Sequence, residues 1–226
     1  SGVPPWRWTR AGAAMAAAGK RVLLIDLDSQ ASLTISVGLE PLEVERTIVD
    51  VLRKDGTPLM ECVQQLSDRL HIVTSIIDLA PMEMELLSRA SREKILDRAL
   101  REARGQYDYI LIDCSPSLGM ITLNALTAAD KVIIPVQAHF LPVKGLEQLL
   151  KTVNKVKRQL NPKLQIGGIL LTMVEGRSNF SKDIGRLLRE SYGNKIKVYE
   201  TEIPRGIKAA ETSAEGKSIY AFDGKG

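Results

Sequence analysis

The 226-residue sequence is poor in aromatic residues and cysteine, and it contains no long apolar run. Aromatic residues make up only 4% of the chain, which argues against recognition of single-stranded nucleic acid by base stacking. The two cysteines, Cys62 and Cys114, cannot form a disulfide framework and lack the spacing of a metal site, so a cytoplasmic protein is expected. No segment approaches the roughly 20 apolar residues that cross a bilayer, and we expect no contact with membranes.

The rest of the composition is that of a globular protein. Hydrophobic residues make up 44% of the chain and charged residues 26%. A net charge of +4 permits contact with nucleic acid without requiring it. No linker rich in glycine, serine or proline divides the chain, so we predict a single domain over residues 1–226, with an atypical segment at residues 1–10.

Short, branched apolar runs alternate with segments of helical periodicity along the chain. Most of these runs are continuously apolar, as in strands that are buried on both faces of a parallel sheet. The alternation predicts an α/β fold with a mostly parallel sheet and helices on both faces. The predicted strands are residues 21–26, 70–75, 109–113, 131–136, 166–173 and 197–203.

Two segments between these runs have the pattern of amphipathic helices. In residues 142–160 apolar residues recur at helical spacing, lysines take the other side, and Asn161–Pro162 ends the pattern. The stretch from Met82 to Arg104 is rich in glutamate and arginine and predicts one long helix.

Acidic residues stand at the ends of two predicted strands. Asp26 and Asp28 close the run RVLLIDLD, and Asp113 follows the run from Tyr109 to Ile112. In an α/β fold, ligands bind at the carboxyl ends of strands, and carboxylates there commonly hold Mg²⁺ together with phosphate oxygens. Each aspartate alone could instead form a turn or cap the next helix. Two such acidic positions in one chain favour a nucleotide–metal site.

Five segments follow one another in order: RVLLIDLDSQASLT, YDYILIDCSPSLGMITLNAL, IIPVQAHFLPVKGLEQLL, ILLTM and EIPRGIKAAETSAEGKSIYAFD. Together they resemble the ParA/Soj family of DNA-partitioning ATPases, from about Ala11 to Asp223. The resemblance implies a P-loop NTPase-like fold, a ParA-type ATPase domain, and ATP and Mg²⁺ as cofactors.

The resemblance also implies roles for single residues. Asp28 would orient the water that attacks the γ-phosphate, and Asp26 would support the magnesium shell. Asp113 corresponds to the Walker B acid that holds Mg²⁺, and residues 115–119 correspond to the switch loop after it. The residues expected around the adenine are Met173, Pro204 and Arg205.

Members of this family bind ATP as a homodimer, bind DNA nonspecifically in that state, and release it after hydrolysis stimulated by a ParB-like partner. The resemblance therefore implies a nucleoid-associated protein of chromosome or plasmid segregation. A late basic cluster matches the region of relatives that contributes to DNA binding, although a solvated basic surface explains it equally well. Its residues are Lys195, Lys197, Arg205 and Lys208.

The phosphate loop of the family, K-G-G-V-G-K-T-T, has no counterpart in the sequence. The helix expected after that loop is present as AGAAMAAAGK, closed by Gly19. Before it, SGVPPWRWTR has one glycine and no lysine, so we predict that the first strand and the phosphate loop are missing and that the chain is short at both ends. The family expectation is an ATP hydrolase, and the alternative is a non-catalytic remnant that retains only DNA or partner binding.

The other candidate functional residues and functions have weaker support in the sequence. His71 and His139 have no acid or nucleophile at a telling spacing and are predicted to be ordinary, partly buried residues. Cys114 is predicted to be a packing residue. A membrane-targeted division-site ATPase would need a C-terminal amphipathic helix and an iron–sulfur carrier would need paired cysteines, and the sequence has neither pattern.

Overall fold

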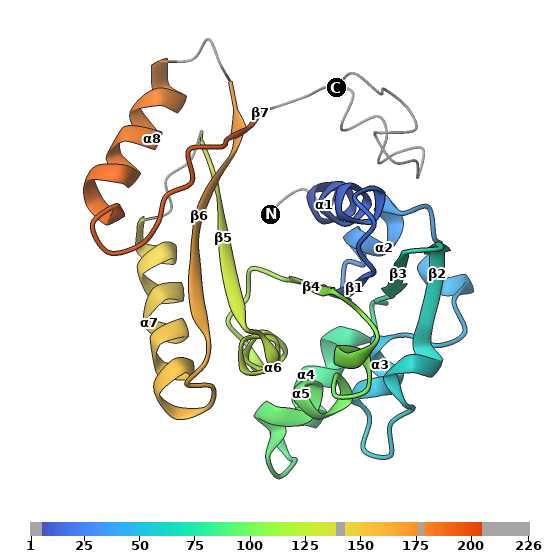
Figure 1. Cartoon of the computed structure of the whole chain (residues 1–226). Coiled ribbons are helices and arrows are strands. Elements are labelled where there is room, and N and C mark those ends of the chain that lie inside the picture. Colours follow the sequence, from blue (N-terminus) through green and yellow to red (C-terminus); the bar gives the residue numbers. More distant parts are fainter. Residues whose placement is uncertain (1–5, 139–142, 176–178, 205–226) are drawn as a thin grey trace. The chain divides into compact units, whose positions relative to one another are not determined.

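A computed structural model describes residues 6–138, 143–175 and 179–204 of the chain (Figure 1). The chain divides into two compact units, of which one holds the chain up to Ala128 and the other begins at Ala129. The prediction of one ParA-type domain over residues 1–226 stays a prediction. Three residues singled out from the sequence, His139, Arg205 and Lys208, lie outside the described residues.

The first unit is built on a four-stranded sheet in the order β2–β3–β1–β4. β1 is parallel to both β3 and β4, whereas β2 is antiparallel to β3. The strands are β1 (Val22–Leu27), β2 (Val63–Ser67), β3 (Leu70–Val73) and β4 (Tyr109–Cys114). The helices are α1 (Trp6–Ala17), α2 (Ser32–Ser36), α3 (Ile48–Leu52), α4 (Leu79–Leu87), α5 (Ile95–Ala99) and α6 (Met120–Ala128), with 3-10 turns at Pro41–Glu43, Leu59–Cys62, Arg92–Lys94 and Ala103–Gly105.

Alternate residues of β1 enter different cores on the two faces of this sheet. Leu23 and Ile25 belong to a cluster that includes residues of α3, α4, α5 and α6. Val22 and Leu24 belong to a second cluster, with residues of α1 and α2. All six residues of β1 are buried, as expected for a strand that is covered on both sides. The predicted α/β fold, with a mostly parallel sheet and helices on both faces, is confirmed in this unit.

The second unit is built on a parallel three-stranded sheet in the order β5–β6–β7. The elements are β5 (Lys131–Gln137), α7 (Val143–Gln159), β6 (Gln165–Val174), α8 (Asn179–Tyr192) and β7 (Ile203–Pro204). Both helices run beside this sheet (Figure 1), and Leu146 of α7 and Leu188 of α8 share a core with Ile169 of β6. The helix predicted before Asn161–Pro162 is confirmed.

The single long helix predicted from Met82 to Arg104 is wrong. The chain instead forms α4, which ends at Leu87, and the short α5, which begins at Ile95. Ser91, between them, has φ of 51°, a left-handed conformation that interrupts a right-handed helix. The break lets both apolar stripes reach the core, since Leu86 and Leu96 are each fully buried.

The strands differ from prediction at two places. The segment 197–203 forms only the short β7 and an isolated bridge between Val198 and Ile169. β2 was not predicted, because its sequence VQQLS is mostly polar and lies half-exposed at one end of the sheet. The other predicted strands are present, with ends shifted by one or two residues.

α1 begins earlier than predicted, at Trp6 rather than at Ala11. Its end is as expected: Gly19 has φ of 84°, and the N–H groups of Gly19 and Lys20 donate to the carbonyl oxygens of Ala16 and Met15. This pattern closes a helix on a glycine that tolerates the left-handed conformation. In the part of the chain that the structure describes, no helix is both long enough and apolar enough to cross a membrane.

Candidate functional site

Asp26 lies near the carboxyl end of β1 and is completely buried. Its Oδ2 accepts two hydrogen bonds from Thr34, from the backbone N–H at 2.9 Å and from the hydroxyl at 2.8 Å. Its Oδ1 accepts a third from the N–H of Asp28, at 3.1 Å. The carboxylate thus links the loop after β1 to α2. These contacts fit the structural role considered from the sequence, in which an aspartate at a strand end forms the following turn.

The charge of Asp26 is poorly compensated. Burial raises its pKa from 3.8 to about 6, because desolvation outweighs the hydrogen bonds that stabilise the carboxylate, and the nearby charge of Asp28 adds to this rise. Among the described residues, no lysine or arginine forms an ion pair with Asp26. At neutral pH Asp26 therefore carries a buried negative charge that no ion pair with a described residue offsets.

Asp28 follows in the loop and is half-buried. Its Oδ1 accepts a hydrogen bond from the N–H of Gln30 at 3.1 Å, and its carbonyl oxygen accepts one from Ala31 at 2.8 Å. Ala31 has φ of 50°, so the loop turns sharply here before α2 begins. Within the described residues Oδ2 of Asp28 has no hydrogen-bond partner, so it can accept a hydrogen bond from a donor such as water.

Asp113 lies beside Asp26 on the neighbouring strand. The two are register partners in the parallel pairing of β1 and β4, and paired residues of a sheet project from the same face. The pKa of the next residue, Cys114, is raised to about 12, mainly by burial. The negative charges of Asp113, Asp26 and Asp28 contribute to the rise, so all three carboxylates lie near this thiol. The thiol stays protonated and packs against the core, as predicted.

The three aspartates form what we call the acidic edge: Asp26, Asp28 and Asp113. Within the described residues, no group of three or more His, Cys, Asp or Glu side chains could hold a metal ion alone. Mg²⁺ does not require such a cage, because it usually keeps its waters and takes one or two carboxylates plus phosphate oxygens. The buried charge of Asp26, beside two further carboxylates, fits a phosphate-bound Mg²⁺. Asp26, with both oxygens already hydrogen-bonded, can support such an ion through its charge rather than by a free ligand atom.

Sequence reasoning missed Thr34 and Glu83. The Thr34 hydroxyl donates to Asp26 and accepts from the N–H of Ser75 at 3.0 Å, so it ties the segment after β3 to the acidic edge. Glu83 of α4 reaches the segment after β4, where a Cβ on Gly119 would lie 1.7 Å from its Oε1. A lone threonine eight residues after an aspartate, or a glutamate on a helix, forms no motif that would have revealed either contact.

The residues predicted around the adenine belong to the second unit. Met173, in β6, is half-buried and has φ of 57°. Pro204, in β7, is exposed and is the register partner of Val174, across a shift that falls between Thr172 and Val174. The structure therefore brings Met173 and Pro204 onto neighbouring strands, with the unusual backbone of Met173 at the irregularity. Arg205 lies outside the described residues.

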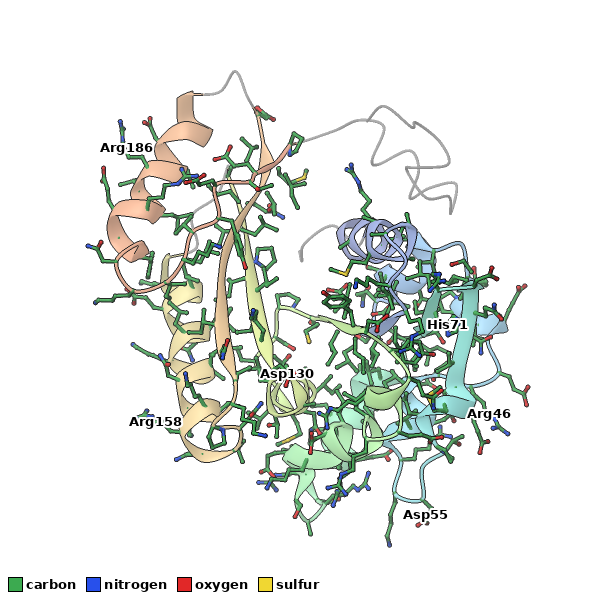
Figure 2. All side chains as sticks on the ribbon, in the orientation of Figure 1. Arg46, Asp55, His71, Asp130, Arg158 and Arg186 are labelled. Atoms are coloured by element: carbon green, nitrogen blue, oxygen red, sulfur yellow. The ribbon has the colours of Figure 1, made fainter. Side chains whose placement is uncertain are left out.

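Of the predicted DNA-binding cluster, the structure describes Lys195 and Lys197. Both side chains are exposed, and Nζ of Lys197 lies 4.7 Å from the ring centroid of Tyr199. Figure 2 labels His71, which is half-buried and whose Nδ1 lies 2.7 Å from the hydroxyl oxygen of Tyr107. His71 is thus an ordinary, partly buried residue, as predicted.

The chain is similar to known proteins over most of its length. A model of the AAA domain family matches residues 9–166. The sporulation initiation inhibitor protein Soj of Bacillus subtilis is 42% identical, over 94% of this chain and 83% of that protein. The chromosome partitioning protein ParA of Caulobacter vibrioides is 38% identical, over 94% and 79%. A solved structure of cobyrinic acid a,c-diamide synthase from Mycobacterium smegmatis, with bound ATP analog and magnesium, is 36% identical, with a TM-score of 0.84 over 100% of this chain and 93% of that one.

Mostly parallel sheets with helices, together with the likeness to this solved structure, define the chain as an α/β protein of the P-loop NTPase-like class. Within that class, the AAA domain match and the extent of the identity to Soj and ParA show the family. The chain belongs to the ParA/Soj family of partitioning proteins.

Proposed function

We propose that this chain is a ParA-like partitioning ATPase, in which ATP with Mg²⁺ binds at the acidic edge and hydrolysis switches the protein between states. The observation that supports this most is the gathering of Asp26, Asp28 and Asp113 at the carboxyl ends of two neighbouring parallel strands. Ligands of parallel α/β folds bind at that edge. The solved relative with bound ATP analog and magnesium supports the choice of ligand.

Each aspartate has a separate role in the proposal. Asp113 holds Mg²⁺ directly or through a bound water, and the ion supplies neutralisation of the phosphate charge. Asp28 uses Oδ2 to accept a hydrogen bond from the attacking water and so to orient it. Asp26 positions Asp28 through the hydrogen bond from the Asp28 N–H, and it anchors α2 through Thr34.

The role of Asp28 can be tested in a chain that is given a family-like N-terminal strand and phosphate loop. That change should establish ATP turnover, and Asp28→Ala should then reduce turnover by about 100-fold or more with ATP affinity retained. Asp55→Ala removes an exposed loop carboxylate of the first unit (Figure 2) and serves as the control. Unchanged turnover in Asp28→Ala would contradict the role of Asp28.

We further propose that the protein acts as a homodimer on nonspecific DNA, at the nucleoid, with a ParB-like protein that stimulates hydrolysis. The partitioning names of the relatives and the exposed Lys195 and Lys197 support this. Replacing both lysines with glutamate should weaken binding to a DNA duplex and reduce its salt dependence. Binding that is unchanged in the double variant would remove these residues from the interface. A DNA affinity that is the same with and without ATP would favour the alternative of a non-catalytic DNA- or partner-binding module.

A further inference from the structure

A second cavity of the first unit has a different character from the acidic edge. It measures about 560 Å³, a volume in the range of small-molecule pockets, which is roughly 300–1,000 Å³. Three parts of the unit line it: the end of α3 with the loop that follows, the residue Arg89 beyond α4, and α5 with the residues just after it. The last of these leads into the amino end of β4, whereas Asp113 lies near the carboxyl end of that strand.

The charge around this cavity is strongly one-sided. One acidic residue, Glu102, lines it beside five basic ones. The five basic residues are Arg53, Lys54, Arg89, Arg98 and Arg101. Over the whole chain, by contrast, 31 lysines and arginines face 27 aspartates and glutamates, so the cavity concentrates a positive charge that the rest of the chain nearly balances.

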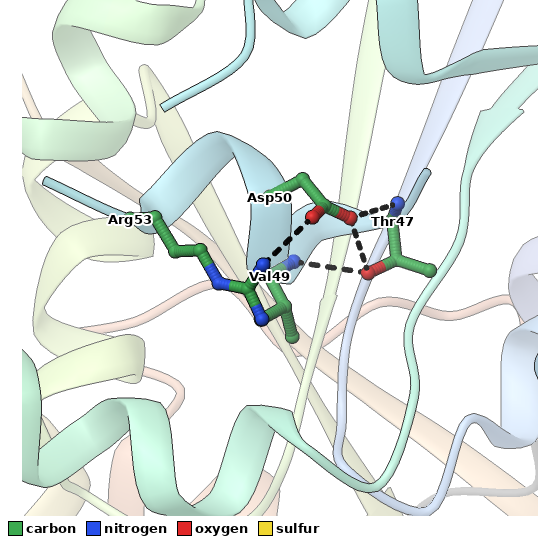
Figure 3. A network of polar contacts seen from close by, with 4 residues as sticks. All are labelled: Thr47, Val49, Asp50 and Arg53. Atoms are coloured by element: carbon green, nitrogen blue, oxygen red, sulfur yellow. Dashed lines mark hydrogen bonds and ion pairs between the residues drawn. The ribbon is translucent and has the colours of Figure 1, made fainter. Parts of the chain in front are cut away.

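Two of these cations are held by the protein and three are not. Arg53 lies 3.3 Å from Oδ1 of Asp50, whose other oxygen accepts bonds from Thr47 in the cap of α3 (Figure 3). Arg89 donates to the carbonyl oxygen of Leu52. The remaining three side chains are exposed and have no ion pair or side-chain hydrogen bond within the described residues. They are Lys54, Arg98 and Arg101.

The lining between these cations is partly apolar. Val51, Leu59 and Ile95 line the cavity and are each less than 10% exposed. The loop that carries Lys54 is closed back onto α3, because the N–H of Thr57 donates to the carbonyl oxygen of Asp50 at 3.0 Å. Gly56 permits this closure, since a Cβ there would lie 2.4 Å from the carbonyl oxygen of Val51. A mostly polar lining with cations on preformed segments suits a small ligand that carries negative charge.

We propose that this cavity, which we call the basic pocket, binds a small phosphate-bearing anion of nucleotide size. Arginine and lysine side chains from separate segments would hold the phosphates. The volume of about 560 Å³ matches the size of a small anion rather than that of a segment of duplex DNA. The acidic edge repels phosphate unless Mg²⁺ is present, so the two sites should differ in their requirement for the metal.

Calorimetric titration without magnesium tests this directly. ADP in EDTA should bind the full chain, and the double variant Arg98→Glu/Arg101→Glu should bind it at least tenfold more weakly. Lys157→Glu/Arg158→Glu makes the same change of charge at two exposed positions of α7 (Figure 2) and should bind ADP like the unaltered chain. A melting curve of each variant establishes that it is folded.

Further arms separate the basic pocket from other sites and ligands. Asp113→Asn should leave magnesium-free ADP binding unchanged, and a change of affinity in either direction in that variant would assign the ADP to the acidic edge and overturn the proposal. Equal loss in the α7 variant would reduce the effect to net charge. If Arg98→Glu/Arg101→Glu weakens the binding of a 20-base-pair DNA duplex but not the binding of ADP, the surface is a nucleic-acid site and the proposal is overturned. Absence of ADP binding at millimolar concentration would also overturn it. Tripolyphosphate binding with the same variant pattern would support it through the phosphates alone.

Discussion

Asp26 carries a charge in a place where water cannot reach it. Three hydrogen bonds stabilise its carboxylate, yet its pKa rises to about 6 because desolvation is the larger effect. A buried carboxylate of this kind destabilises the empty protein at neutral pH, and a bound cation would relieve the cost. This residue therefore links the hydrogen-bonded structure of the loop to the proposed metal chemistry of the acidic edge.

The pH dependence of stability should show this cost. In the unfolded chain Asp26 titrates near 3.8 and in the folded chain near 6, so the folded state binds its proton more tightly. Its contribution to stability is therefore full below pH 3.8 and is lost as the pH rises to about 6. The total loss is about 3 kcal/mol, since a tenfold change in proton binding corresponds to about 1.4 kcal/mol.

Urea unfolding of the unaltered chain and of Asp26→Asn between pH 3.5 and 7 measures this contribution. The difference in unfolding free energy between the two proteins should shift by about 3 kcal/mol toward the asparagine variant as the pH rises. A difference that stays constant over this range would mean that Asp26 ionises with an ordinary pKa.

Thr34 provides a second prediction at this scale. Thr34→Val keeps the shape of the side chain but removes a donor to Asp26 and an acceptor for the N–H of Ser75. Buried groups left without partners cost about 1–3 kcal/mol each, so the variant should lose about 2–3 kcal/mol of unfolding free energy in urea. Thr127→Val is the matched control, because the buried Thr127 hydroxyl donates only to the carbonyl oxygen of Leu123 in its own helix. Equal losses in the two variants would contradict the bridging role of Thr34.

At the scale of elements, the segment between β4 and α6 is held from two sides. The hydroxyl of Thr122 in α6 donates to the carbonyl oxygen of Ser117 at 2.6 Å. Glu83 of α4 fills the space that a side chain at Gly119 would need, and its Oε1 is buried without a hydrogen-bond partner in the described residues. This segment lies shortly after Asp113, so packing against α4 affects the position of the chain at the carboxyl end of β4.

Gly119→Ala should force the Glu83 carboxylate to move, and because that group is the end of a flexible side chain the loss of unfolding free energy should be about 1 kcal/mol or less. The double variant Glu83→Ala/Gly119→Ala should recover part of this loss, because the truncated side chain leaves room for the new methyl group. Gly105→Ala is the control, since a Cβ there meets no atom within 4 Å. Strict additivity of the two substitutions in denaturant unfolding would show that Glu83 and Gly119 are not coupled.

Elements with strong local signals could be predicted from the sequence, and those that depend on distant contacts could not. β1 is continuously apolar because both of its faces are covered, so the run is visible without the structure. The break at Ser91 was hidden because Met82–Arg104 has helical periodicity on both sides of it, and only the shared core decides where the chain bends. Asp26 and Asp113 were found as strand ends, whereas Thr34 approaches through the fold and carries no pattern of its own.

At the scale of the whole molecule, the net charge is a modest +4, although the first unit contains two sites of opposite charge. Three aspartates gather at the carboxyl ends of β1 and β4, and five basic residues surround the cavity near α3 and α5. Anions should therefore bind the first unit in two ways, of which only one depends on Mg²⁺. Under the proposed function, the nucleotide switch lies at the acidic edge.

The most direct test of that switch is the thermal melting of this chain with and without millimolar Mg-ATP, beside Asp113→Asn. A ligand at a hundred times its Kd stabilises the native state by about 2.7 kcal/mol, which raises the Tm of a chain this size by about 5–10 °C. We predict a cooperative transition that rises with Mg-ATP in the unaltered chain and rises less in Asp113→Asn, in which only the basic pocket is intact. A cooperative transition that Mg-ATP leaves unmoved would contradict nucleotide binding at the acidic edge.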